Sequence, residues 1–176
     1  MTLKALQHLL EAARALAPDR EFVVLGSAAL LAGIPSLGDP GAPLAATYDA
    51  DLCPRPFDEL TGEMLEEALG QSRAYYRRHG YHADILRDSI LGTFPLGWES
   101  RLIPVPGVKG AQAVEAHDLA ATKLLVGRDK DLALVRQLLA DDRLDRSLIE
   151  ERIRLLPAPV EALPRVMAAL RSAAGS

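Results

Sequence analysis

The sequence lacks several features that mark particular classes of protein. Cys53 is its one cysteine, so no disulfide forms within the chain and a metal site built on several thiolates is excluded. No stretch approaches the roughly 20 consecutive apolar residues that span a bilayer. We therefore expect a soluble chain without a membrane segment, in a reducing compartment such as the cytoplasm.

Positive charge is also scarce, because 20 Lys and Arg face 24 Asp and Glu and the formal net charge is −4. A nucleic-acid backbone demands clustered basic residues, so the composition as a whole does not indicate a nucleic-acid binder. The nearest basic cluster is Arg73, Arg77, Arg78 and His79. Two catalytic motifs are missing as well: a Ser-His-Asp arrangement, and the Gly-x-x-x-x-Gly-Lys-Ser/Thr loop of P-loop proteins.

What is present is the composition of a globular protein, with 49% apolar and 25% charged residues. Strand-like and helix-like patterns alternate over the first two thirds, and helical spacing fills the last third. We expect an α/β (α+β) fold, with a small mixed sheet flanked by helices and a C-terminal helical extension. The expected division is an α/β core over residues 1–115 and a helical part over 116–176.

The individual elements follow from apolar periodicity, Pro, Gly and capping residues. Pro54 and Pro56 are expected to end the second strand, and Pro164 to lie in the first turn of the last helix. Asp58 and Asp145 are expected to cap helices, and Gly80 to end the helix that Asp58 begins. The expected strands are 21–25, 47–52, 81–86, 98–105 and 112–114. The expected helices are 3–17, 28–32, 58–79, 118–126, 130–139, 147–155 and 160–170.

Gly26 and Ser27 come directly between the first strand and the helix that follows it. A glycine at a strand end lets the backbone approach a ligand closely, and a helix N-terminus suits a phosphate. The plain alternative is an ordinary turn, because many such turns contain Gly-Ser.

Asp49 and Asp51 share one face of the second strand, because successive strand residues alternate. Two carboxylates on one face repel each other, and a divalent cation such as Mg²⁺ relieves the repulsion. The alternative is that both face solvent. Tyr48 and Leu52 are expected on the other face, where they would anchor the strand in the core.

Asp84 lies within an otherwise apolar strand and is a candidate third carboxylate, as metal ligand or general base. Asp88 and Glu99 remain rival candidates. His82 shares strand parity with Asp84, so both are expected on the same sheet face. Farther along, Asp118, Lys123, Arg128, Lys130 and Asp131 lie on or between two expected helices, where ordinary surface ion pairs are the plain interpretation.

Taken in order, these segments resemble the nucleotidyltransferase superfamily typified by DNA polymerase β. The pattern is Gly26-Ser27, then Thr47-Tyr-Asp49-Ala-Asp51, a hairpin-like Gly97-Trp-Glu-Ser-Arg-Leu102, and a helical motif from Asp118 to Asp131. Within it, the similarity is closer to small bacterial nucleotidyltransferase-like proteins that are related to the toxins of abortive-infection, type IV toxin–antitoxin systems. The resemblance covers roughly residues 20–140.

The resemblance implies transfer of a nucleotidyl group from a nucleoside triphosphate to an RNA or protein acceptor, with pyrophosphate leaving. Asp49 and Asp51 would bind Mg²⁺ or Mn²⁺, with Asp84 as the third catalytic carboxylate. The implied nucleotide-binding residues are Gly26, Ser27, Lys123, Arg128, Lys130 and Asp131. A cognate antitoxin would be a partner, no membrane is involved, and a homodimer is left open.

Two other hypotheses remain beside the active enzyme. Ala45 and Ala46 stand just before Thr47, where relatives often carry a basic residue, which slightly favours a catalytically degenerate relative that binds a partner. An unrelated scaffold with an accidental Asp-x-Asp would place Asp49 and Asp51 far from Ser27.

Overall fold

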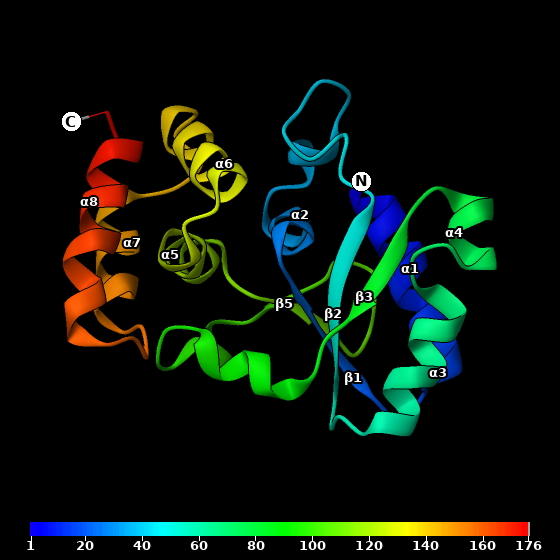
Figure 1. The fold of residues 1–176 in the computed structure, drawn as a ribbon. Helices are drawn as coiled ribbons and strands as arrows, with labels where there is room; N and C mark the ends of the chain where they lie inside the picture. Colours follow the sequence, from blue (N-terminus) through cyan, green and yellow to red (C-terminus); the bar gives the residue numbers. More distant parts are fainter. Residues whose placement is uncertain (176) are drawn as a thin grey trace. The chain divides into compact units, whose positions relative to one another are not determined.

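The computed structural model describes residues 1–175, which form eight α-helices and one five-stranded sheet (Figure 1). The predicted α+β class, with a small mixed sheet flanked by helices and a helical C-terminal part, is confirmed. The chain divides into two compact units. Unit 1 comprises Met1–Ile90 and Leu102–Val114, and unit 2 comprises Leu91–Arg101 and Glu115–Ser176. No helix in the described chain is long and apolar enough to cross a membrane.

Unit 1 is built around the sheet, whose strand order is β3-β2-β1-β5-β4. The β2–β3 and β1–β5 pairs are parallel, and the β1–β2 and β4–β5 pairs are antiparallel. The strands are β1 (Glu21–Leu25), β2 (Asp49–Arg55), β3 (His82–Ile85), β4 (Ile103–Pro104) and β5 (Ala111–Ala113). The helices are α1 (Leu3–Leu16), α2 (Leu30–Gly33), α3 (Glu59–Leu69) and α4 (Ala74–His79). Unit 1 also has short 3-10 helices at Ser27–Ala29 and Pro35–Gly38. A third, Asp88–Thr93, crosses the boundary at residue 90, and Trp98–Arg101 and Val160–Ala162 belong to unit 2.

The core of unit 1 covers both faces of the central strand. Phe22, Val23, Val24 and Leu25 are all buried, and Figure 1 draws α1 and α3 to one side of the strands and α2 to the other. A strand buried on both faces has a continuous apolar sequence rather than an alternating one, as β1 does. Helix α1 begins where the Thr2 side chain accepts a hydrogen bond from the Ala5 N–H, and it buries one apolar stripe.

The prediction that Pro54 ends the second strand is wrong, because β2 continues to Arg55. Phe22 of β1 is the residue opposite Pro54, and its N–H donates to the Gly110 carbonyl rather than to β2. The pair is therefore one without hydrogen bonds between its two residues, so Pro54 needs no N–H on the side that faces β1. On the other side, the β3 ladder reaches only Leu52. The missing donor of Pro54 therefore faces a stretch with no strand to pair, where proline is tolerated.

The helix expected over residues 58–79 is two helices, α3 and α4, separated by Gly70–Arg73. The Asp58 side chain caps α3 as expected, since its carboxylate accepts from the Thr61 N–H at 2.9 Å. Ser72 adopts a left-handed backbone with φ of 65°, which interrupts the helical path. Gly80, also left-handed at φ of 77°, ends α4 as predicted.

The strand expected over residues 98–105, with its hairpin, is also wrong. Trp98–Arg101 forms a 3-10 helix and only Ile103–Pro104 is strand. Trp98 is buried and its ring packs on Phe94. The Arg101 guanidinium is fixed by a partner 17 residues away, a contact that local periodicity does not reveal.

Unit 2 contains the last four helices, α5 (Ala116–Val126), α6 (Asp129–Ala140), α7 (Arg146–Arg154) and α8 (Leu163–Ala173). Pro164 lies in the first turn of α8, as predicted. Asp145 caps α7, accepting from the N–H groups of Ser147 and Leu148. The apolar stripe of α8 is core rather than free surface, because Val166, Leu170 and Ala173 are buried.

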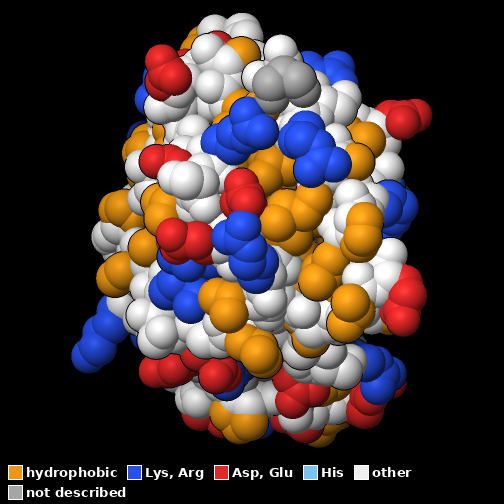
Figure 2. All heavy atoms as spheres, turned by 90° about the vertical axis from the view of Figure 1, so that its left-hand side faces the viewer, with side chains coloured by type: hydrophobic (Ala, Val, Ile, Leu, Met, Phe, Trp, Pro, Cys, Tyr) orange, Lys and Arg blue, Asp and Glu red, His pale blue; other side chains and the backbone are white. Residues whose placement is uncertain are grey.

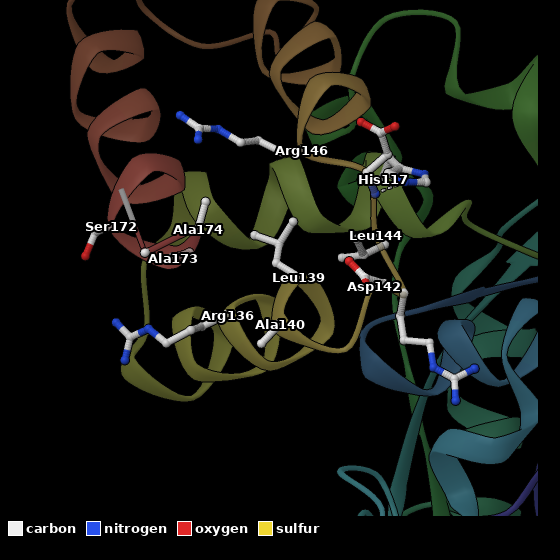
Figure 3. A pocket seen from close by; sticks show the side chains of 13 residues that line it. His117, Arg136, Leu139, Ala140, Asp142, Leu144, Arg146, Ser172, Ala173 and Ala174 are labelled. Carbon is white, nitrogen blue, oxygen red and sulfur yellow. Dashed lines mark hydrogen bonds between the residues drawn. The ribbon is translucent and has the colours of Figure 1, made fainter.

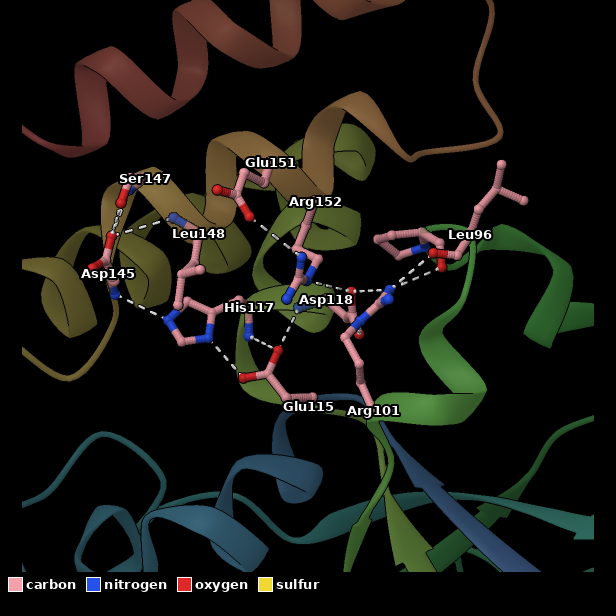
Figure 4. A network of polar contacts seen from close by, with 11 residues as sticks. Leu96, Arg101, Glu115, His117, Asp118, Asp145, Ser147, Leu148, Glu151 and Arg152 are labelled. Carbon is pink, nitrogen blue, oxygen red and sulfur yellow. Dashed lines mark hydrogen bonds and ion pairs between the residues drawn. The ribbon is translucent and has the colours of Figure 1, made fainter.

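A buried carboxylate ties the parts of unit 2 together (Figure 4). Asp118 on α5 is fully buried and accepts two hydrogen bonds from Arg101, at 2.8 Å from Nε and 2.9 Å from Nη2. Arg152 on α7 lies 3.3 Å away. Arg101 also donates to the carbonyl of Leu96. Asp118 therefore joins the 91–101 segment, α5 and α7 through one charge that has no access to water.

We expect Asp118→Asn to destabilise unit 2 by about 3–5 kcal/mol, because it leaves two arginines without their buried counter-charge. Trp98 is the only tryptophan and lies in unit 2, so its fluorescence during urea unfolding reports on this unit. Asp141→Asn, at an exposed position, is the matched control and should change stability by less than about 0.5 kcal/mol. Equal effects of the two substitutions would contradict a central role for Asp118.

Candidate functional site

The predicted site begins where β1 ends against β2. Leu25 pairs with Asp51, and Gly26 follows with φ of 55° and ψ of −161°, a conformation essentially reserved for glycine. A Cβ built on Gly26 would lie 1.8 Å from Oδ2 of Asp51. The Asp51 carboxylate thus occupies the space that any side chain at position 26 would need. Glycine is required here both for backbone conformation and for this close approach.

The parallel pairing of β2 with β3 brings further polar residues to the same place. Asp49 pairs with His82 and Asp51 with Asp84. Paired residues of neighbouring strands point to the same face, about 5 Å apart. Asp49, Asp51, His82 and Asp84 therefore share one face at one end of the sheet. The accidental-motif hypothesis placed the Asp pair far from Ser27, whereas Asp51 contacts the residue directly before it.

The opposite face of these strands is apolar and holds the carboxylates in position. Ala50, Leu52 and Ala83 are fully buried, whereas Asp49, Asp51 and Asp84 are half-buried. The expected anchor Tyr48 is wrong: it precedes β2 and is 58% exposed. Ala50 takes that role together with Leu52, so the Asp face is fixed by small and branched apolar groups rather than by an aromatic ring.

His82 contacts the candidate third carboxylate. Its Nε2 lies 3.3 Å from Oδ1 of Asp84, and the edge of its ring meets the Tyr76 ring, with centroids 5.2 Å apart. The His82 side chain is 8% exposed and that of Asp84 45%. A buried imidazole therefore orients a solvent-accessible carboxylate. The shared face of these two residues, expected from strand parity, is confirmed.

The three aspartates have the chemistry of a hard-cation site, since Mg²⁺ and Mn²⁺ prefer carboxylate oxygens. Their side chains do not converge as they lie, because Asp51 is turned onto Gly26 and Asp84 onto His82. In agreement, no group of three or more His, Cys, Asp or Glu side chains in residues 1–175 is arranged to hold a metal. The donor set fits such an ion, and Asp51 and Asp84 would each rotate to share it.

The rival third carboxylates lie elsewhere. Asp88 is exposed beyond the end of β3, and Glu99 is exposed in unit 2. Asp88 instead affects Cys53, whose pKa is raised to about 11 mainly by burial and further by this negative charge. Cys53 is fully buried and so behaves as a small core residue.

The charged residues of the expected C-terminal motif contact one another within unit 2. Asp131 is buried, and its carboxylate accepts from Nζ of Lys123 and from Nε of Arg128, each at 2.5 Å. The Lys123 side chain is 9% exposed and that of Arg128 59%. Lys130 is exposed on the first turn of α6. Lys123, Arg128 and Asp131 are thus brought together, as a buried ion-pair cluster rather than a solvated run of charge.

Unit 2 also has a feature that the sequence did not reveal, a hollow of about 1040 Å³ (Figures 2 and 3). Figure 3 shows Arg136 of α6 and Arg146 of α7 at its rim, with small and apolar side chains of α6 and α8 between them. Figure 2 shows hydrophobic side chains in the open, bordered by basic ones. None of the predicted site residues lines this hollow. Its residues come from α5, α6, α7 and α8 and from the loop between α6 and α7, so no local motif marks it.

No family model, curated protein or solved structure matches the chain in comparisons with known proteins. The resemblance to nucleotidyltransferases therefore rests on the residues of this chain, and the arrangement at Gly26, Asp51 and Asp84 has to be tested directly.

The contact between Gly26 and Asp51 predicts an energetic coupling. Gly80→Ala is the matched control, because Gly80 also has a positive φ but a Cβ there would meet open space. It should lower the free energy of unfolding by about 1–2 kcal/mol. Gly26→Ala should cost more, because the new methyl collides with Asp51. In an Asp51→Ala background the cost of Gly26→Ala should fall by about 1 kcal/mol or more in a double-mutant cycle. Additive effects in urea unfolding would show that the two residues do not touch.

The Asp131 cluster predicts a pH dependence of unit 2. Burial raises the pKa of Asp131, but hydrogen bonds from Arg128 and Lys123 outweigh it and hold the pKa below the ordinary 3.8. Because the pKa of Asp131 is lower in the folded than in the unfolded chain, its ionised form contributes fully to the free energy of unfolding above about pH 4. That contribution is lost as the pH falls through the pKa of the folded state. The Trp98-monitored urea midpoint should fall in this acid range. Asp131→Asn should flatten that slope, whereas Asp129→Asn, exposed on the same helix, should not.

Proposed function

We propose that the chain is a metal-dependent nucleotidyltransferase that moves a nucleotidyl group from a nucleoside triphosphate to a hydroxyl of an RNA or protein acceptor. The observation that carries this proposal is the packing of Asp51 on Gly26, with Asp49 and Asp84 on the same sheet face. This unites a glycine that admits a ligand to the backbone with carboxylates that suit a cation.

Each residue has a role in the proposed reaction. Asp49 and Asp51 would hold a divalent cation, which would neutralise charge on the phosphates. Gly26 would let the triphosphate approach the backbone, and the Ser27 hydroxyl would donate a hydrogen bond to it. The helix after Gly26 is short, a 3-10 turn followed by Leu30–Gly33, so its dipole contributes little.

Asp84 is the proposed general base, positioned by His82. It would accept the proton of the acceptor hydroxyl as that oxygen attacks the α-phosphorus. The bond between the α-phosphorus and the bridging oxygen breaks in line, and pyrophosphate leaves with that oxygen. The register, which sets Asp84 beside Asp51, favours it over Asp88 and Glu99 for this role.

A second candidate function is a catalytically degenerate nucleotidyltransferase fold that binds a partner. The observation that favours it is the neutralisation of Lys123 and Arg128 by Asp131, which leaves less positive charge for a triphosphate. Ala45 and Ala46 add no basic residue before the Asp pair. By the resemblance to toxin systems, the partner would be a cognate antitoxin or a second copy of the chain.

Isothermal titration calorimetry of the four ribonucleoside triphosphates, with and without Mg²⁺, tests the proposal. Wild type should bind at least one triphosphate only with the metal, and Asp49→Asn/Asp51→Asn should weaken binding at least tenfold, because the carboxylates that hold the cation are gone. Asp39→Asn, on an exposed loop, is the matched control and should leave affinity unchanged.

Three further variants identify the base once an acceptor is found. Asp84→Asn should lower kcat with little change in triphosphate affinity, whereas Asp88→Asn and Glu99→Gln should not. Absence of triphosphate binding by a folded wild-type protein would reject the enzyme. A co-purifying partner or a stable dimer, measured by light scattering, would then support the degenerate form.

A further inference from the structure

One ring nitrogen at the aspartate site has no partner. His82 of β3 is more than nine-tenths buried, and its Nδ1 is a buried atom without a hydrogen-bond partner among residues 1–175. A buried polar atom that bonds nothing destabilises a fold, and in native proteins it commonly marks the position of a water molecule or an ion. His82 lies on the sheet face that also holds Asp49, Asp51 and Asp84.

The other ring nitrogen decides where the proton of the neutral imidazole lies. Nε2 of His82 is 3.3 Å from Oδ1 of Asp84, and a carboxylate oxygen accepts hydrogen bonds. Two lone pairs would repel each other at this distance, so we assign the proton to Nε2. Nδ1 then carries a lone pair rather than a hydrogen. The atom without a partner is therefore a ligand atom, and a cation suits it.

The imidazole ring is held in one orientation from two directions. Tyr76 of α4 meets it at an angle of 88°, with ring centroids 5.2 Å apart, and Asp84 contacts its Nε2. A side chain that is already fixed loses little conformational freedom when it binds an ion. A histidine that binds a metal through one nitrogen usually donates the N–H of the other to a carboxylate or a carbonyl, and His82 has this arrangement with Asp84.

The strand register places a second ligand beside this ring. Asp49 of β2 is the residue that pairs with His82, and paired strand residues lie about 5 Å apart. Two ligands of one octahedral ion, each about 2.1 Å from it, lie about 3 Å from each other. Asp49 is half-buried and makes no hydrogen bond or ion pair with any described residue, so its carboxylate can turn toward an ion. Both side chains can therefore reach the same ion.

We propose that Nδ1 of His82 is the third ligand of the cation that Asp49 and Asp51 hold, and that the site takes a divalent transition-metal ion such as Mn²⁺ in preference to Mg²⁺. This ligand set rests on the proposed function, which assigns the cation to the two aspartates. Mg²⁺ binds oxygen ligands almost exclusively, whereas a transition-metal ion accepts an imidazole nitrogen beside carboxylate oxygens. His82 thus takes the place of Asp84 among the ligands.

This ligand set leaves Asp84 to act as the base. Asp84 keeps its contact with Nε2 of His82 through Oδ1, and its side chain is 45% exposed, so an acceptor hydroxyl can reach it. A carboxylate that binds a cation directly takes up a proton less readily, because the two positive charges compete for the same oxygens. Asp84 avoids this competition when the imidazole lies between it and the ion.

The test is the binding of Mn²⁺ alone to the full chain, followed by pulsed electron paramagnetic resonance. This method detects a nitrogen nucleus bound to Mn²⁺, and selective ¹⁵N labelling of histidine identifies that nitrogen as imidazole. Wild type should bind one Mn²⁺ and show the coupling to histidine nitrogen. Calorimetry should give an affinity for Mn²⁺ at least tenfold higher than for Mg²⁺.

Three variants separate the ligand from its neighbours. His82→Gln should remove the nitrogen coupling and lower Mn²⁺ affinity at least tenfold, with a smaller effect on Mg²⁺, because the amide supplies an oxygen instead of a nitrogen. Asp84→Asn should retain the coupling, because its amide oxygen can still accept from Nε2. His79→Gln is the matched control, since His79 is a half-buried histidine of α4 that is not part of this set, and it should change neither result.

The ligand set would be overturned by Mn²⁺ that binds without a nitrogen coupling, by a coupling that survives in folded His82→Gln, or by no binding of Mn²⁺. Nδ1 would then bond only a water molecule. None of these results decides the triphosphate titration, in which the nucleotide also binds the metal. Loss of triphosphate binding with the coupling intact would reject the nucleotidyltransferase and leave the metal site standing.

Discussion

The parallel pairing of β2 with β3 is the constraint on which the candidate site depends. It sets Asp49 beside His82 and Asp51 beside Asp84, and a slip of one residue would turn each pair to opposite faces. The register is held from the other face, where Ala50, Leu52 and Ala83 are fully buried. Burial of three apolar side chains thus fixes the location of three carboxylates that gain nothing from being close together.

Much of the fold was predictable because its signals are local. The bounds of β1 follow from one apolar run. Capping by Asp58 and Asp145 marks the starts of α3 and α7, and Gly80 marks the end of α4. The errors arose where a distant contact decides. Strand β2 continues through Pro54 because its pairing with β3 ends at Leu52. Trp98–Arg101 forms a 3-10 helix from which Arg101 reaches the distant Asp118. Neither partner can be read from the neighbouring residues.

The candidate site divides in the same way. Strand parity was sufficient to place Asp49 with Asp51, and His82 with Asp84, on common faces. It could not show that Asp51 fills the space a side chain at position 26 would need, because that depends on the pairing of β1 with β2. It also missed the contacts among the rings of His8, Tyr75, His79 and Tyr81, because His8 and Tyr81 are 73 residues apart in the sequence.

The two proposed functions, an active nucleotidyltransferase and a degenerate one, differ in what they require of the Lys123–Asp131 pair. A buried ion pair is weak evidence for stability, because desolvation offsets most of the attraction, but removing one partner is costly. A triphosphate that bound Lys123 would displace Asp131 only by supplying at least equal negative charge, which a phosphate group does. Arg128, with its side chain 59% exposed, can stay with Asp131 during that exchange. Neutralisation in the free protein is therefore compatible with the proposed binding of a nucleotide, which would shift Lys123 from one anion to another.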